Sequence, residues 1–154
     1  RDSVASRGLG DVYKRQLNFS DNKNDSVRNI VEALISTGVA AGIAGSSRPC
    51  SGSEHLISHA LDIVSPNNGL HGEKCGMASI AMSKLHGLDW QGIRNALLRV
   101  NCPTNVDDLG ITADEMIEAI NLAPTIRPER YTILNNVNLE RESIRKLLSD
   151  TNCI

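Results

Sequence analysis

The chain has 154 residues, of which 40% are apolar and 22% charged, and its net charge is −2. This composition is typical of a soluble globular protein of one modest domain. Nucleic-acid-binding proteins usually carry a basic patch or stripe, and this chain has none, so we expect no nucleic-acid partner. Aromatic residues make up only 3%. The core must therefore consist mainly of Leu, Ile, Val, Ala and Met.

The cysteines and the apolar stretches predict the compartment. The four cysteines, at positions 50, 75, 102 and 153, are widely spaced and form no C-x-x-C pair. This spacing indicates free thiols rather than a zinc ribbon or a small secreted disulfide scaffold. The longest continuous apolar stretch, residues 39–44, is far too short to cross a bilayer. No secretory signal segment opens the chain, so we expect a cytoplasmic protein with no membrane partner.

The first sixteen residues differ from the rest of the chain. They show neither helical nor strand periodicity, and the sequence does not begin with Met. We interpret residues 1–16 as a non-native or read-through leader. Residues 17–154 are then expected to form one helical domain of a longer protein whose amino-terminal part is missing.

The apolar spacing predicts helices from residue 24 onward. Asn24 or Asp25 is expected to cap a helix that runs into the small-residue stretch 38–47 and ends before Arg48-Pro49. A second helix is expected to start near residues 51–53. The turn-forming residues 65–69 separate it from a third helix, which begins at His71, continues through Leu85 and ends at His86-Gly87.

The rest of the sequence continues the helical pattern. Asp89 is expected to cap a fourth helix, and Thr104 and Thr112 to open two shorter ones. Arg127-Pro128 marks a break, and residues 139–148 have the pattern of a last amphipathic helix. No alternating strand pattern and no internal repeat is present. The predicted fold class is all-α, a helical bundle.

Three histidines fall within seventeen residues. His55 and His59 are four residues apart, so both rings project from one helical face, with Cβ atoms about 6 Å apart. His71 begins the next helix, after a turn that can return it toward that face. Two imidazoles from adjacent helices can form part of a metal site, and a catalytic zinc keeps three protein ligands and one open position. Spacing alone leaves the alternative open: a polar helix stripe and a capping residue.

Three ordered strings carry a family resemblance. They are SSRPCSGSEHLISHALD (46–62), GLHGEKCG (69–76) and IRPERYTIL (126–134). Together they resemble the glycerol-1-phosphate dehydrogenases, the archaeal-type branch of the iron-containing alcohol dehydrogenase and glycerol dehydrogenase superfamily. The likeness extends from about Ser26 to the last residue.

The resemblance implies a specific reaction and architecture. Members of this family reduce dihydroxyacetone phosphate to sn-glycerol 1-phosphate with NADH or NADPH, for archaeal ether-phospholipid synthesis. An amino-terminal nucleotide-binding domain is followed by a helical carboxyl-terminal domain. A divalent metal, usually zinc, is held between the domains by one Asp and two His. By this resemblance the chain is the metal-binding half, with NAD or NADP bound mainly by the missing domain.

The resemblance also assigns roles to individual residues. His55 in GSEH and His71 in LHGEK match the two histidine ligands of the metal, and His59 matches a histidine that contacts substrate and takes part in catalysis. The Asp ligand has no counterpart in this sequence. Cys50 stands where the family is expected to have a small residue such as Ala.

The substrate phosphate needs positive charge and N–H donors. Arg48 and the helix start at Ser51 are the expected phosphate ligands, because helix N-termini attract anions. Lys74 is another candidate for this role. Glu54 and Glu73 adjoin the ligand histidines, and either orient them or only favour the starts of their helices.

Two other functions remain open from the sequence. A dehydrogenase of glycerol or another polyol, or a dehydroquinate synthase relative, would use similar metal ligands. A free-standing helical binding module would have no catalysis and would ignore divalent metals. No Gly-rich loop follows a strand, so these residues do not demonstrate nucleotide binding. We expect the chain alone to bind metal weakly, to have no turnover, and to form homo-oligomers through its apolar surface.

Overall fold

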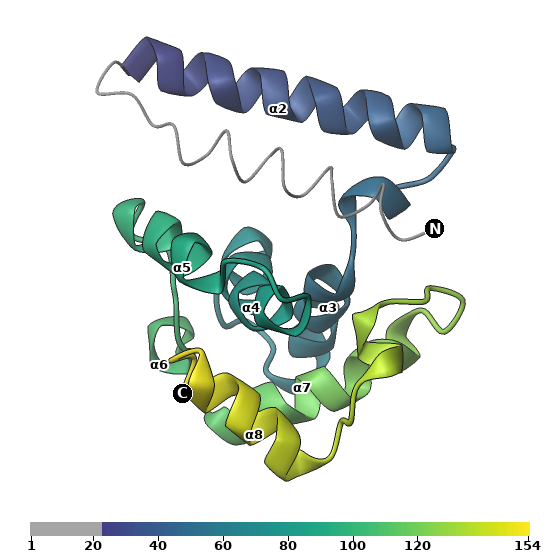
Figure 1. Ribbon diagram of the computed structural model, residues 1–154, viewed down its shortest axis with the longest axis vertical. Helices are drawn as coiled ribbons and strands as arrows, with labels where there is room; N and C mark the ends of the chain where they lie inside the picture. Colours follow the sequence, from purple (N-terminus) through teal and green to yellow (C-terminus); the bar gives the residue numbers. More distant parts are fainter. Residues whose placement is uncertain (1–22) are drawn as a thin grey trace. The chain divides into compact units, whose positions relative to one another are not determined.

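The computed structural model describes residues 23–154 (Figure 1). Within this part of the chain, α-helices and short 3-10 helices are present and no strand is. The prediction of an all-helical fold is confirmed for these residues. The predicted leader, residues 1–16, lies outside them. The chain divides between Gly52 and Ser53 into two compact units, and each is described by itself.

The first unit contains one long helix and one short one. Helix α2 (Lys23–Ala44) begins before Asn24 and Asp25, so these residues lie inside the helix and the prediction that one of them caps it is wrong. The small residues up to Ala44 continue the helix. The 3-10 helix η1 (Arg48–Cys50) follows, and the Cys50 thiol donates a hydrogen bond to the Thr37 carbonyl at 3.3 Å. This contact fastens η1 to α2.

Helix α2 bears on the expectation of no membrane segment. Residues 27–44 have the length and composition of a membrane-crossing helix, with a mean hydropathy of 1.3. The expectation considered only continuous apolar residues, whereas this span also includes Gly, Ser and Thr and the ion pair of Arg28 and Glu32. Signal sequences and core helices of soluble proteins share these properties. Length and composition alone are therefore weak evidence for a membrane span.

The second unit contains the remaining helices. They are α3 (Ser53–Val64), α4 (His71–Leu85), α5 (Trp90–Arg99), α6 (Val106–Leu109), α7 (Ala113–Ile126), the 3-10 helix η2 (Ile133–Asn136) and α8 (Arg141–Asp150). Helix α3 packs against both α4 and α7, α5 packs on α4, and α8 packs on α7 (Figure 1). Helix α3 thus has the central position.

The sequence of α3 explains this position. Its apolar residues Leu56, Ile57, Ala60 and Leu61 recur at helical spacing and are almost completely buried. They lie along one stripe, as expected for a helix packed on its neighbours. Ile63, off this stripe, is exposed. Burial of the stripe fixes how α3 is rotated and therefore where its polar residues point.

The turn before α4 was predicted from composition and depends on backbone geometry. Asn67 and Gly69 have φ of 72° and 68°, in the left-handed region that Gly and Asn tolerate best. A Cβ at Gly69 would lie 2.7 Å from a methyl group of Leu109. A glycine is therefore required at position 69 both by the positive φ and by the closeness of Leu109. The turn delivers His71 to the first position of α4, and the predicted helix His71–Leu85 is confirmed at both ends.

The Thr104 prediction is wrong by one residue. The N-cap of α6 is Asn105, whose side chain accepts a hydrogen bond from the Asp108 backbone N–H at 2.8 Å. The Thr104 N–H in turn donates to the Asp108 carboxylate at 3.0 Å. Ser, Thr, Asn and Asp are all favourable N-cap residues. The sequence therefore does not distinguish Thr104 from Asn105, and the two hydrogen bonds with Asp108 decide which of them caps α6.

Two further boundaries differ from the prediction. Thr112 caps α7 as predicted, with Glu115 completing a capping box, but α7 has 14 residues and is not short. The last helix is Arg141–Asp150 rather than 139–148. Leu139 precedes it because the Asn138 side chain accepts a hydrogen bond from the Glu140 N–H at 2.9 Å, which holds the chain outside the helix at this point.

Two isoleucines of α3 provide a matched test of this packing. Ile57 is 0% exposed and Ile63 is 63% exposed. We expect Ile57→Ala to lower the free energy of unfolding by about 2–5 kcal/mol, because a buried methyl-rich side chain leaves a cavity. Ile63→Ala should change it by less than about 0.5 kcal/mol. Urea unfolding followed by circular dichroism measures both values. Equal losses for the two variants would contradict the described rotation of α3.

Candidate metal centre

Three histidines come together where α3 meets the start of α4. His55 and His59 lie one turn apart on α3, and His71 is the first residue of α4. The centroid of the His71 ring is 5.3 Å from that of His55 and 5.3 Å from that of His59. The buried stripe of α3 and the turn at residues 65–69 produce this convergence. The role of the three residues as ligands and substrate contact stays a prediction.

A buried carboxylate orients His55. The Nδ1–H of His55 donates to Oε1 of Glu54 at 2.8 Å, and the Glu54 side chain is only 8% exposed. A carboxylate that accepts this bond requires the proton to be on Nδ1, so the lone pair of the neutral ring is on Nε2. Of the two roles considered for Glu54, the geometry favours orientation of the ring. An imidazole held in this way is typical of metal ligands.

Ser58 holds His71 from the opposite helix. Its side chain is completely buried, and its Oγ lies 2.9 Å from Nδ1 and 3.4 Å from the carbonyl oxygen of His71. Both contacts are satisfied when the hydroxyl donates to the carbonyl and Nδ1–H donates to the hydroxyl. In this arrangement the Nε2 lone pair of His71 is also left for a ligand.

Cys75 lies one helical turn after His71. Its Sγ is 3.6 Å from Nε2 of His71. Ligand atoms of His55, His71 and Cys75 all lie within 4.8 Å of one another. Burial raises the pKa of the Cys75 thiol to about 11, so the free thiol is protonated near neutral pH. Sequence reasoning did not select Cys75, although its i, i+4 spacing from His71 was available as a signal.

His59 is half-buried, whereas His71 is exposed. Burial lowers its pKa below the ordinary value of 6.5, and the neighbouring His71 lowers the pKa further, while Asp62 opposes the shift. The Nδ1 of His59 is 3.8 Å from a carboxylate oxygen of Asp62. At neutral pH the ring is therefore mainly uncharged. A neutral imidazole can accept a hydrogen bond at one nitrogen and donate at the other.

Lys74 is unsuited to its predicted phosphate role. Its side chain is 5% exposed, and its Nζ forms an ion pair with Oδ1 of Asp62 at 2.7 Å. A buried ammonium that is already paired cannot reach a substrate phosphate without leaving its partner. The pair instead joins α3 to α4 beside the histidines. Sequence reasoning missed it because residues twelve apart on different helices have no local pattern.

The donor set fits a divalent cation of the zinc type. Two imidazoles whose Nδ1 atoms are held by other side chains, with a thiol nearby, are groups that zinc favours. A second group of ligand atoms, from His59, Asp62 and His71, also lies within 4.8 Å. Its carboxylate is engaged by Lys74. The first group is therefore the better cation site.

The other predicted residues lie elsewhere or act locally. Arg48 and Ser51 belong to the first unit, at η1 and its C-cap, and their binding of phosphate stays a prediction. Glu73 accepts a hydrogen bond from the Leu70 N–H at 2.7 Å, so it supports the start of α4 rather than a histidine.

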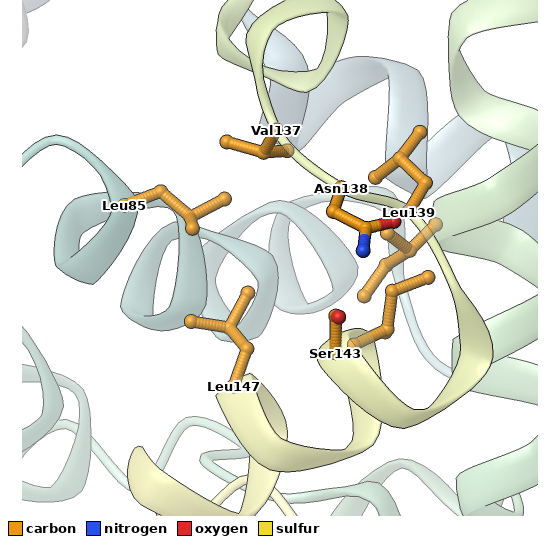
Figure 2. A pocket seen from close by; sticks show the side chains of 8 residues that line it. Leu85, Val137, Asn138, Leu139, Ser143 and Leu147 are labelled. Atoms are coloured by element: carbon orange, nitrogen blue, oxygen red, sulfur yellow. The ribbon is translucent and has the colours of Figure 1, made fainter.

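A separate pocket is present in the second unit (Figure 2). It has a volume of about 220 Å³ and lies between the carboxyl end of α4, the segment before α8, and α8 itself. Leu85 and His71 are at opposite ends of α4, about 21 Å apart along a helix of this length. Its lining contains no acid, base or metal ligand: Leu85, Ile120, Val137, Asn138, Leu139, Ser143, Ile144 and Leu147. It is not part of the histidine cluster.

Comparison with known proteins supports the resemblance. The chain is 54% identical over 130 residues to a protein of Thermococcus sibiricus named glycerol-1-phosphate dehydrogenase (NAD(P)+), a match of 84% of this chain and 37% of that protein. Proteins of the same name from Metallosphaera sedula and Nitrosopumilus maritimus are 54% identical over 129 and 127 residues. The matches cover 84% and 82% of this chain, and 37% and 36% of those relatives.

The resemblance to glycerol-1-phosphate dehydrogenases is confirmed. The chain spans a little over a third of the length of these relatives. No protein-family model matches it. Identity at this level over more than four-fifths of the chain includes the helices that carry the histidine cluster, so the local geometry and the relationship concern the same residues.

The Asp62–Lys74 pair gives an asymmetric prediction. Asp62 is 50% exposed, whereas Lys74 is 5% exposed. Asp62→Asn should lower the free energy of unfolding by about 1–3 kcal/mol, because it leaves a buried ammonium without its counter-charge. Lys74→Met should cost less, because Asp62 stays in contact with water and the apolar stem is replaced in kind. Denaturant unfolding of both variants tests this order, and a larger loss for Lys74→Met would contradict it.

Proposed function

We propose that this chain is the metal- and substrate-binding part of an NAD(P)H-linked dehydrogenase that reduces dihydroxyacetone phosphate to sn-glycerol 1-phosphate. The observation that carries the proposal is the cluster of His55, His59 and His71, in which the Nδ1 atoms of both proposed ligands are already engaged. Relatives named for this activity support the choice of substrate. The activity of the whole protein is part of this proposal.

His55 and His71 would hold the cation through their Nε2 atoms. A bound divalent cation supplies Lewis acidity, which stabilises the negative charge that develops on a ketone oxygen during hydride transfer. Glu54 and Ser58 keep the two rings from rotating, so the ligands need little reorganisation when the cation binds. We favour zinc, because two imidazoles are a softer donor set than magnesium or calcium prefers.

His59 would contact the substrate and manage a proton. Its lowered pKa keeps the ring mainly neutral at pH 7, so it can hold a proton on one nitrogen and hydrogen-bond the substrate with the other. Asp62, near its Nδ1, favours a proton at that position. Arg48 and Ser51 are proposed to bind the phosphate of the substrate.

The nucleotide would be bound by residues outside this chain. The described residues contain no strand followed by a Gly-rich turn, which is the usual support for a dinucleotide. Together with the coverage of the relatives, this favours a partner domain for NAD or NADP. A glycerol dehydrogenase would use the same ligands, but the names of the relatives favour the phosphorylated substrate. We propose a cytoplasmic location.

Zinc titration tests the metal site directly. His55→Ala and His71→Ala should each weaken zinc binding by about 10-fold or more. Loss of a group that only orients a ligand already costs about 10–100-fold, and these variants lose the ligand itself. His86→Ala is the matched control, because His86 is the C-cap at the other end of α4. Calorimetry of the reduced chain measures the affinities. Equal zinc affinity in all four proteins would favour a helical binding module without metal.

A chimera tests the activity. The matched segment of the Thermococcus sibiricus relative would be replaced by the 130 residues of this chain that match it, and oxidation of NADH or NADPH would be followed with dihydroxyacetone phosphate. We expect turnover, with a clear preference over unphosphorylated dihydroxyacetone, and no turnover by this chain alone.

In the same chimera, His59→Ala should lower kcat by about 100-fold or more while zinc binding is retained, since a positioned acid or base contributes about 10²–10⁴ in rate. His86→Ala should leave kcat unchanged. A preference for the unphosphorylated ketone would overturn the proposed substrate, and full activity of the His59 variant would overturn its role.

A further inference from the structure

We propose that Lys74 is a positioning residue for His59 and acts on it through the carboxylate of Asp62. The inference rests on the proposed function, in which His59 contacts the substrate. It adds that a charge held inside the protein selects which nitrogen of His59 faces the substrate. Lys74 itself would contact neither the substrate nor the cation, so its effect reaches the reaction only through His59.

The carboxylate of Asp62 lies between an ammonium and an imidazole. Its Oδ1 accepts a hydrogen bond from Nζ of Lys74 at 2.7 Å, and its Oδ2 is 3.8 Å from Nδ1 of His59. Because the two oxygens belong to one planar group, holding Oδ1 also fixes the direction of Oδ2. The second distance is longer than a hydrogen bond, and catalytic hydrogen bonds often shorten when substrate binds.

The burial of Lys74 allows it to act as an anchor. The side chains of Lys74 and Asp62 are 5% and 50% exposed. A carboxylate in contact with water loses side-chain entropy when it is held in one geometry, and a surface ion pair compensates this loss poorly. A buried ammonium has no such freedom, because leaving its counter-charge would leave it buried and unpaired. Asp62 is therefore held from inside the protein although half of it contacts water.

Stability alone does not explain a charge at position 74. Buried ion pairs can often be replaced by apolar side chains of similar volume without loss of stability. Among the side chains that the structure describes, Glu54 and Lys74 are the charged ones that are buried. Both adjoin the histidine cluster. Glu54 accepts a hydrogen bond from His55, and Lys74 holds the carboxylate beside Nδ1 of His59.

A fixed carboxylate selects one neutral form of the His59 ring. Negative charge near Nδ1 favours the form with its proton on that nitrogen, which leaves the Nε2 lone pair to accept a hydrogen bond from a substrate hydroxyl. A neutral imidazole in water prefers the opposite form, with its proton on Nε2. Without Lys74 the Asp62 carboxylate is free to turn toward water, and the ring returns to the Nε2–H form.

Nitrogen NMR of the 154-residue chain measures this form directly. The chain would be labelled with ¹⁵N-histidine, and long-range ¹H–¹⁵N correlations would be recorded at about pH 8, where a ring with a lowered pKa is neutral. The signals of His59 would be assigned from their absence in His59→Gln. We expect the Nδ1–H form to predominate in the unaltered chain and the Nε2–H form in Lys74→Met.

Lys84→Met is the matched control. Lys84 lies in the last turn of the same helix, and its Nζ pairs with a carboxylate oxygen of Asp150 at 3.2 Å. This variant should leave the His59 signals unchanged. Circular dichroism would verify that each variant is folded, and the form of His59 in the unaltered chain is a readout that needs no variant.

The chimera with the Thermococcus sibiricus relative measures the effect on the reaction. Lys74→Met should lower kcat by about tenfold or more, the scale on which loss of a group that orients a histidine acts. The KM for NADH or NADPH should be unchanged, because the nucleotide is proposed to bind elsewhere. Lys84→Met should keep the kcat of the unaltered chimera.

The outcomes separate the role of Lys74 from the proposed function. A predominant Nε2–H form in the unaltered chain, or an unchanged form in Lys74→Met, would overturn the role of Lys74. Full kcat of Lys74→Met in an active chimera would also overturn it. Absence of turnover in the unaltered chimera would count against the proposed function, and the NMR measurement would still decide whether Lys74 selects the form of His59.

Discussion

The contact between Ser58 and His71 is the interaction on which the histidine cluster depends. Ser58 belongs to the central helix α3, whose buried stripe fixes its rotation, and its hydroxyl contacts both the ring and the backbone of the first residue of α4. Because Ser58 is completely buried, no water competes for the hydroxyl. The contact therefore holds the start of α4 against α3 and sets the orientation of the His71 ring.

The buried residues of α3 include polar side chains only near the histidine cluster. Ser53, Glu54 and Ser58 are buried on a helix whose other buried residues are apolar. Burial of a polar group costs free energy unless a partner accepts or donates its hydrogen bonds, and Glu54 and Ser58 have such partners in His55 and His71. Local departures from the rules of packing are expected where a protein binds or reacts with something. The polar part of α3 lies where the histidines do.

The ends of the helices were predicted best where turn-forming residues precede or follow a helix. The limits of α4 followed from the Pro-Asn-Asn-Gly turn before it and from His86-Gly87 after it. Boundaries between similar capping residues, such as Thr104 and Asn105, depended on hydrogen bonds that pattern cannot distinguish. The convergence of the three histidines could be predicted from the sequence because two of them share a helical face. The side chains around them, Ser58, Lys74 and Asp62, could not be predicted in the same way, because only the packing of α3 on α4 brings them together.

The cluster can be compared with the simplest alternative, in which the histidines form a polar stripe and a helix cap. A surface stripe needs no buried partners, and its imidazoles would be free to rotate in water. Here Glu54, at 8% side-chain exposure, and the fully buried Ser58 each engage one Nδ1. A capping role for His71 is also unnecessary, because Glu73 already satisfies the N–H of Leu70. Two rings held by buried partners support the proposed cation site better than a surface stripe would.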